Sequence, residues 1–159
     1  MLLSVRFIYA SIGILLAAVL LTGDFCSGAS LRWIEYPKVF STAKEKGKPV
    51  LLYFYMPGCQ YCKTLDEQYF ADAGIRKMMT EDFVLSRVDG TAQRDIAAEF
   101  EVMAYPTVWL LNAKGERLVK IPGLLEKGEY RTFLEYAGKG QHRTMDLRSY
   151  LRSKSRSKY

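Results

Sequence analysis

The spacing of apolar residues from position 30 onward predicts an alternation of helices and strands. Apolar residues at helical intervals predict helices over residues 36–46, 62–80 (interrupted at 71–74), 92–100 and 126–137. Runs rich in β-forming residues predict strands over residues 50–55, 83–88, 107–111 and 116–121. The run Val50-Leu-Leu-Tyr-Phe-Tyr55 is apolar on both faces, which is typical of a central strand.

Residues that end helices or form turns separate these segments. Gly47 and Pro49 end the first helix, and residues 112–115 form a turn between the last two strands. The resulting order, α-β-α-β-α-β-β-α, predicts an α/β fold in which a mixed sheet is covered by helices. We place this domain at residues 30–140, a length that suits a single hydrophobic core.

The first 29 residues have the pattern of a secretory signal peptide. Arg6 precedes an apolar stretch over 7–21, and Ser27-Gly28-Ala29 supplies small residues for cleavage. Cys26 would leave with this segment. The alternative is an uncleaved membrane anchor, although residues 7–21 are shorter than the roughly 20 residues that a membrane-spanning helix needs.

The net charge of +6 is concentrated at the C-terminus. Residues 139–159 contain seven Lys and Arg side chains and one acidic residue, whereas residues 30–138 are neutral overall. A nucleic-acid-binding face needs cations spread over a folded surface, so this distribution argues against a nucleic-acid partner. Residues 141–159 are a basic extension, in which 144–151 has apolar side chains that would allow packing and 152–159 is expected to be disordered. The alternative role for its charge is a weak contact with an anionic surface or an acidic partner.

The motif Cys59-Gln60-Tyr61-Cys62 follows the central strand directly and carries the candidate chemistry. Thiols at positions i and i+3 share a face where a helix begins between them, which brings them within disulfide range. The positive end of a helix favours thiolate on the first cysteine, so Cys59 is the predicted nucleophile. Cys62, one turn deeper, is the predicted resolving thiol. The reversible Cys59–Cys62 disulfide is then the redox centre, with no other cofactor and no metal.

Three other uses of the two thiols compete with this interpretation. A structural disulfide closing so small a loop would remove little entropy from the unfolded chain. Zinc needs about four ligands, but there is no second cysteine pair, and His142 is the only histidine. Copper(I) could bind two thiolates with Met56 nearby, so a copper carrier remains an alternative.

The segment Ala104-Tyr105-Pro106-Thr107 lies just before an apolar strand. Together with the Cys-x-x-Cys motif it makes the chain resemble the thioredoxin superfamily, in which a strand, this motif at a helix start, a proline, a β-hairpin and a final helix follow in order. The resemblance implies a thioredoxin-like fold in which Pro106 is cis and lies opposite the disulfide. It also implies that Tyr105 and Pro106 bind extended substrate segments.

Within the superfamily the chain resembles secreted bacterial thioredoxin-like proteins of the SoxW-like kind. The segments 54–63 and 100–107 carry this likeness. The resemblance implies a periplasmic location, disulfide-containing protein substrates and a membrane-bound electron donor that keeps the thiols reduced in an oxidising compartment.

Three positions depart from ordinary thioredoxins. Gly58 replaces the usual tryptophan before the first cysteine, Tyr53 replaces a buried aspartate, and Leu85 replaces a lysine near it. Removal of the Cys62 proton therefore has no evident carboxylate to assist it. Because the tuning residues Gln60 and Tyr61 bring no cation to stabilise the Cys59 thiolate, they favour a reductase.

These observations predict an extracytoplasmic thiol:disulfide oxidoreductase that reduces protein disulfides. The alternatives are a disulfide oxidase or isomerase that uses the same residues, or a copper(I) carrier. The reduction potential of the cysteine pair distinguishes the reductase from the oxidase or isomerase. Copper(I) binding without turnover on disulfides would identify the carrier.

Overall fold

A computed structural model describes residues 30–156, and from Leu31 onward they belong to one compact unit. The predicted signal peptide or anchor over 1–29, with Cys26, lies outside the described residues. Among the residues described, no helix is long and apolar enough to cross a membrane. The strands are β1 (Trp33–Ile34), β2 (Val50–Tyr55), β3 (Val84–Asp89), β4 (Thr107–Leu111) and β5 (Arg117–Pro122). The helices are α2 (Lys38–Lys46), α3 (Gln60–Thr64), the π-helical turn η1 (Leu65–Phe70), α4 (Ala73–Asp82), α5 (Arg94–Glu99), α6 (Lys127–Gly138), the 3-10 turn η2 (Gln141–Arg143) and α7 (Leu147–Arg156).

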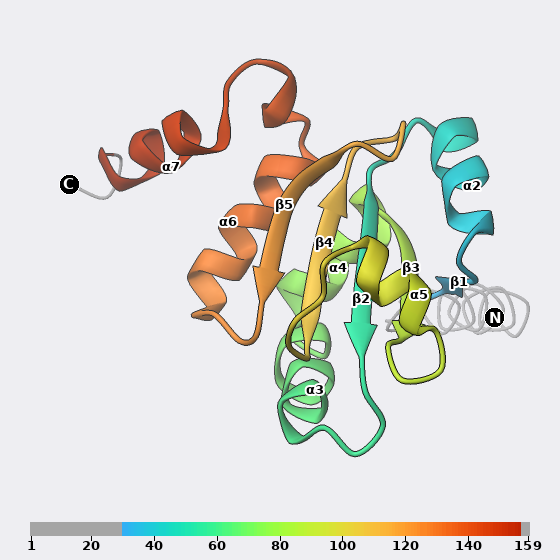
Figure 1. Cartoon of the computed structure of the whole chain (residues 1–159). Helices are drawn as coiled ribbons and strands as arrows, with labels where there is room; N and C mark the ends of the chain where they lie inside the picture. The colour runs from blue at the N-terminus through green and yellow to red at the C-terminus, as the bar shows by residue number, and fades with distance from the viewer. Residues whose placement is uncertain (1–29, 157–159) are drawn as a thin grey trace, which may run out of the picture. The chain divides into compact units, whose positions relative to one another are not determined.

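The strands form one mixed sheet in the order β1-β3-β2-β4-β5 (Figure 1). β1 and β2 pair with β3 in parallel, whereas β4 runs antiparallel to both β2 and β5. The central position of β2 explains its continuous apolar sequence, since both faces of the strand are covered. The predicted α/β fold with a mixed sheet flanked by helices is confirmed.

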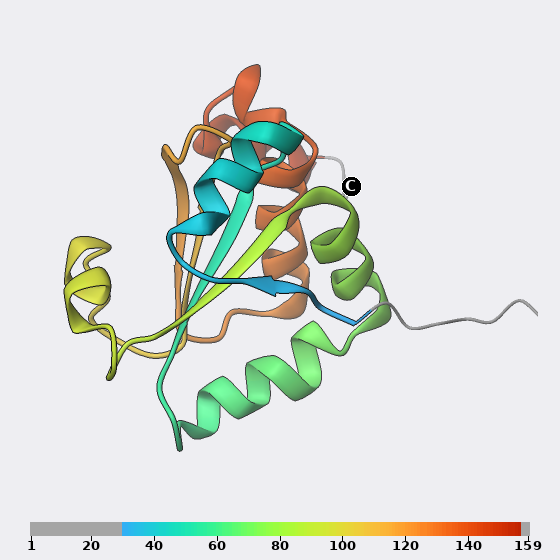
Figure 2. The same cartoon turned by 90° about the vertical axis from the view of Figure 1, so that its right-hand side faces the viewer.

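Each face of the sheet has its own hydrophobic core. On one face, β2 contributes Leu51 and Tyr53, which pack with Leu65 and Phe70 from η1 and with residues of α4 and α6. On the other face, side chains of β2 pack with residues of α2 and α5. Figure 2 shows α5 on one side of the strands and α4 on the other. The helix that begins at the Cys-x-x-Cys motif therefore belongs to the first core.

Within residues 30–140, the structure differs from the predicted elements most clearly at three places, and other bounds shift by one or two residues. β1 was not predicted, because two residues are too few for a periodic signal. α2 begins at Lys38, after Pro37 at its N-cap position, and so starts two residues later than predicted. The helix predicted over 62–80 begins earlier, at Gln60. Its predicted interruption is present before α4, where the Asp72 carboxylate accepts hydrogen bonds from the backbone N–H of Gly74 and Ile75, each at 3.0 Å.

The basic C-terminal extension packs on the domain through α7. Tyr150 is buried, and its ring centroid lies 5.3 Å from that of Tyr136 on α6. Its hydroxyl donates a hydrogen bond to Glu135 at 3.2 Å. The expectation of disorder over 152–159 is corrected for 152–156, which continue the helix with exposed side chains, while 157–159 lie outside the described residues. The helix α7 is stabilised because one apolar side of it is buried against the domain, and the overall composition of the segment does not reveal this.

Replacing Tyr150 with alanine should lower the free energy of unfolding by about 2 kcal/mol, because a buried aromatic side chain and its hydrogen bond are lost. Thermal unfolding followed by circular dichroism measures the change. Leu151→Ala on the same helix is the matched control, since Leu151 is 38% exposed, and its effect should stay within about 0.5 kcal/mol. Equal melting temperatures for Tyr150→Ala and the wild type would show that α7 does not stabilise the domain.

Candidate active site

The two cysteines lie where β2 ends and α3 begins. After Tyr55 the chain turns through residues 56–58, and Cys59 is the N-cap residue of α3. Its sulfur accepts a hydrogen bond from the backbone N–H of Cys62 at 3.2 Å. The cysteines form a disulfide with their Cα atoms 5.2 Å apart, inside the usual range of roughly 4.4–6.8 Å. The helix start that the motif requires is therefore present.

The cysteines differ in exposure, as expected from their positions on the helix. Cys62 is 4% exposed and packs in the first core, whereas Cys59 is only partly buried. An incoming disulfide can reach the Cys59 sulfur first. The difference in burial fits the separate roles predicted for a nucleophile and a resolving thiol.

The loop before β4 comes within contact distance of the disulfide. The Tyr105–Pro106 peptide bond is cis, and Pro106 is buried. The Cys59 sulfur lies 3.7 Å from the carbonyl oxygen of Tyr105. The structure thus brings together Cys59, Tyr105 and Pro106, which are far apart in the sequence and were predicted to share the site.

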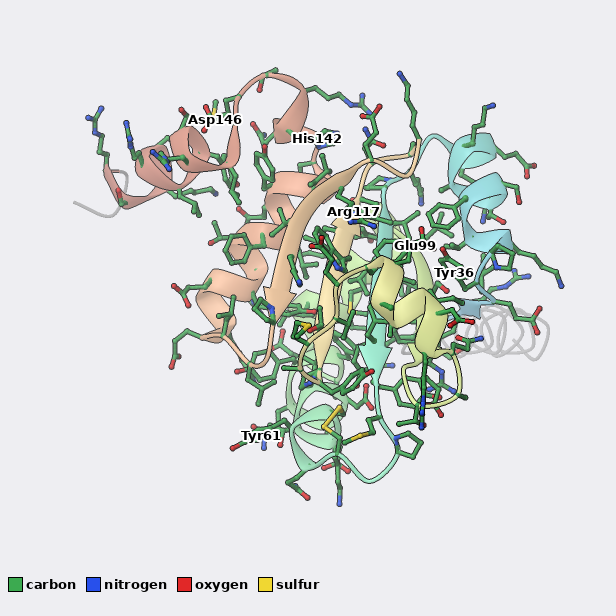
Figure 3. The ribbon with its side chains drawn as sticks, viewed as in Figure 1. Tyr36, Tyr61, Glu99, Arg117, His142 and Asp146 are labelled. Carbon is green, nitrogen blue, oxygen red and sulfur yellow. A yellow bond between two sulfur atoms is a disulfide. The ribbon has the colours of Figure 1, made fainter. Side chains whose placement is uncertain are left out.

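The two residues between the cysteines point outward. Gln60 is exposed, and Tyr61 is 67% exposed. Figure 3 shows the Tyr61 side chain extending away from the yellow disulfide bond. Both side chains are accessible to a partner that approaches the site.

Gly58 has a backbone φ of +77°, a left-handed conformation that side chains rarely adopt. A tryptophan would be strained in this backbone conformation, whereas glycine adopts it freely. Instead of a flat aromatic wall, the surroundings of the site carry three exposed apolar side chains: Met56, Tyr61 and Met103.

A cavity of about 560 Å³, which we call the Tyr105 groove, lies beside the proline loop. Val102, Met103 and Tyr105 line one part of it and Gly90 another. Gly90 is buried, and a Cβ atom there would overlap the Tyr105 ring. The glycine therefore makes room for Tyr105 next to the disulfide. Sequence reasoning missed Gly90, because the need for a glycine appears only once these two loops are adjacent.

A second cavity, of about 470 Å³, contains both cysteines and Asp66, and we call it the cysteine cavity. Asp66 was also missed by the sequence analysis. Its position four residues after Cys62, one helical turn further on, was the only available signal. Tyr53, which replaces the buried aspartate of ordinary thioredoxins, places its hydroxyl 3.5 Å from the carbonyl oxygen of Cys62.

Metal ligands do not gather around the thiols in the part of the chain that the structure describes. Over residues 30–156, no three His, Cys, Asp or Glu side chains come close enough to hold a metal ion. His142 lies far from the disulfide, at the other end of the ribbon in Figure 3. Met56, the soft ligand considered for copper(I), lines the cysteine cavity.

Comparison with known proteins places this site in a family. Residues 36–138 match the model of the thioredoxin-like domain. The chain is 34% identical over 74 residues to protein disulfide-isomerase from Hordeum vulgare, and 41% identical over 59 residues to protein disulfide-isomerase 1 from Caenorhabditis elegans. These matches cover 46% and 37% of this chain but only 14% and 12% of the two relatives.

Solved structures share the fold. A DsbH oxidoreductase superposes with a TM-score of 0.64 at 18% identity, covering 76% of this chain and 92% of that one. A thioredoxin from Thermus thermophilus gives a TM-score of 0.61 at 25% identity, covering 67% and 86%. At 18% identity, the likeness to the DsbH oxidoreductase shows the fold alone.

Proposed function

Because the chain belongs to the thioredoxin-like domain family, as a thiol:disulfide oxidoreductase with a Cys-x-x-Cys pair, we propose that it reduces disulfide bonds of proteins outside the cytoplasm. The observation that carries this proposal is the accessible Cys59 sulfur above a buried Cys62, next to the Tyr105 carbonyl. Disulfide-containing proteins are the proposed substrates.

The reaction has two steps and needs no external cofactor. The Cys59 thiolate attacks one sulfur of the substrate disulfide, which breaks that bond, forms a mixed disulfide and releases one substrate thiolate. Cys62 then loses its proton and attacks the Cys59 sulfur. The second substrate sulfur leaves as a thiolate, and solvent protonates both released thiolates. Two electrons pass from the cysteine pair to the substrate disulfide.

The direction of electron flow follows from how well the Cys59 thiolate is stabilised. Gln60 and Tyr61 are neutral, and the nearby Lys63 ammonium lies 3.8 Å from the Glu67 carboxylate, which offsets its charge. A less stabilised thiolate gives up electrons more readily, so this arrangement supports a reductase rather than an oxidase.

Substrate binding is assigned to the backbone of Tyr105 and to the adjoining Tyr105 groove. The Tyr105 carbonyl faces the disulfide, and Met103, 91% exposed, offers an apolar contact beside it. An extended segment carrying a cystine could pair with this backbone while its apolar side chains contact Met103 and Tyr61.

The location and electron donor are further parts of the proposal. The secretory pattern of residues 1–29 and the SoxW-like motif segments support a periplasmic protein whose thiols are reduced again by a membrane-bound donor. The cations of α7 would add a weak contact with an anionic membrane surface. Sedimentation with vesicles containing anionic phospholipid, at low and at high salt, tests that contact.

Turnover on two opposite substrates tests the proposed direction. The protein should accelerate reduction of the interchain disulfides of insulin by dithiothreitol, and it should not introduce disulfides into reduced, unfolded ribonuclease. Faster formation of native disulfides in ribonuclease would instead identify an oxidase or isomerase.

A further inference from the structure

Resolution by Cys62 requires a proton acceptor. The Cys62 side chain is only 4% exposed and lies in an apolar core, where little water can reach its thiol to take up the proton. At the position of Tyr53, ordinary thioredoxins carry a buried aspartate that can accept this proton, and tyrosine has no carboxylate to do so. A protonated thiol is a poor nucleophile, so the second step depends on a group that removes this proton.

Asp66 is placed to be that group. It follows Cys62 by four residues, through the end of α3 into η1, and side chains at this spacing lie on one face of a helix. Both residues line the cysteine cavity, to which Cys59 also contributes. Asp66 and the two cysteines thus border one cavity of about 470 Å³. Residue Asp66 is exposed overall, which lets it exchange protons with solvent.

Two buried tyrosines, Tyr53 and Tyr130, belong to the same core as Cys62. The Tyr53 hydroxyl lies 3.5 Å from the Cys62 carbonyl oxygen, and the buried Tyr130 hydroxyl has no hydrogen-bond partner among the residues described. Burial raises the pKa of Tyr53, and the charge of Asp66 raises it further. Burial, Tyr53 and Asp66 raise the pKa of Tyr130 in the same way. The charge of Asp66 therefore acts on both buried tyrosines.

The charged groups around Asp66 set its basicity. Loss of contact with water raises the pKa of the Asp66 carboxyl, Arg87 on β3 lowers it, and Glu67 raises it again. Lys63 also lines the cavity. Arg87 is held over the rings of Trp33 and Tyr55, at 5.9 and 5.7 Å from their centroids. The net rise brings the carboxyl closer in pKa to a thiol, and this improves proton transfer between them.

We propose that Asp66 accepts the Cys62 proton across the cysteine cavity, and that Asp66 with Arg87 takes over the role left vacant by Tyr53 and Leu85. The inference deepens the proposed function, because it concerns the resolving step of the same cysteine pair. In that step the Cys62 S–H proton passes to the Asp66 carboxylate, and the Cys62 sulfur bonds to the Cys59 sulfur. The bond between Cys59 and the substrate sulfur breaks with release of the substrate thiolate, and Asp66 returns its proton to solvent.

The two steps can be timed separately with 5,5′-dithiobis(2-nitrobenzoate). Cys59 of the reduced protein attacks the reagent and releases a first thionitrobenzoate, and attack by Cys62 then releases a second. Stopped-flow absorbance resolves both rates between pH 5 and pH 9. The variants are Asp66→Asn and Asp66→Glu, with Glu67→Gln as the matched control, since Glu67 is the neighbouring carboxylate and lines the same cavity. Melting temperatures check that each variant is folded.

A base of this kind gives the wild type a distinct pH profile. The second release should be slow below the raised pKa of Asp66, rise as the carboxyl ionises, and then reach a level region at higher pH. In Asp66→Asn the second release should be about 100-fold slower near pH 7 and should rise about tenfold per pH unit. The first release should stay within about twofold in Asp66→Asn, and Asp66→Glu should regain part of the rate. Glu67→Gln keeps the proposed base, so it should keep most of the second-release rate, with the rise moved to slightly lower pH because Glu67 raises the pKa of Asp66.

Three results would overturn the proposal: an unchanged second release in Asp66→Asn, equal slowing of both releases, or the same loss in Glu67→Gln. Should Asp66→Asn fail to fold, a wild-type second release that rises in proportion to hydroxide, without a level region, would also overturn it. The reagent is a small disulfide, so these rates do not depend on the direction of electron flow. A protein that proves to be an oxidase would contradict the proposed function while leaving the assignment of Asp66 standing.

Discussion

Replacing Cys59 with serine is expected to lower the rate of insulin reduction by at least about 10³-fold, because the first covalent bond to the substrate can no longer form. Cys62 cannot substitute for it, since its side chain is only 4% exposed. Turbidity of the precipitating insulin chain measures the rate. The melting temperature of the variant should be compared with that of the reduced wild type, which removes the effect of the lost disulfide.

The matched variant Cys62→Ser should behave differently. Its Cys59 thiolate can still attack, but the mixed disulfide has no resolving thiol, so a covalent complex with the substrate should accumulate. Electrophoresis without reductant, followed by mass spectrometry, identifies the species. Retained turnover in Cys59→Ser, or complexes formed through Cys62 in that variant, would contradict the assigned order of the cysteines.

The second large effect is expected at Gly90. An added methyl group there would overlap the Tyr105 ring, whose backbone carbonyl lies 3.7 Å from the Cys59 sulfur. Gly90 has no positive φ, so the backbone itself accepts alanine and the overlap is the main change. Overpacking of this kind costs about 1–3 kcal/mol, and we expect Gly90→Ala to lower kcat/KM for insulin by roughly 10- to 100-fold.

Gly128→Ala provides the control for this substitution. Gly128 lies on α6, and an added Cβ would meet no atom within 4 Å, so its activity should equal that of the wild type. In Gly90→Ala the first thionitrobenzoate release should change little, because the small reagent needs no peptide-binding surface. Full activity of Gly90→Ala on insulin would show that the placement of Tyr105 does not matter for protein substrates.

Local pattern was enough to predict most of the fold. β2 and β4 have the bounds that their apolar runs predict, since both strands are buried and contain no residue that interrupts the pattern. β1 has only two residues and exists through its pairing with Leu85 and Ser86 of β3, so no local signal identified it. The helical end of the chain was missed for a related reason, because it depends on burial of Tyr150 against α6.

The site, like the fold, has residues that a local pattern identifies and residues whose role depends on neighbours distant in the sequence. Cys59 and Cys62 were assigned from their spacing, which favours a redox pair over a structural disulfide or a zinc site, and Pro106 was assigned through the thioredoxin motif order. Gly90 and Asp66 acquire meaning only from neighbours that are distant in sequence: Tyr105 for the first, and Arg87 and Tyr130 for the second. Sequence reasoning left the proton acceptor of Cys62 unidentified, since Tyr53 at the usual position has no carboxyl.

The equilibrium reduction potential of the Cys59–Cys62 pair tests the central claim most directly. The protein without residues 1–29 would be equilibrated with dithiothreitol or glutathione buffers, and the fraction of free thiols would be measured by alkylation and mass spectrometry. A reductase with neutral residues between its cysteines should have a potential near about −270 mV, the value typical of thioredoxin. A potential near about −120 mV would mean that the thiolate is strongly stabilised, and would contradict the claim that this protein reduces disulfides.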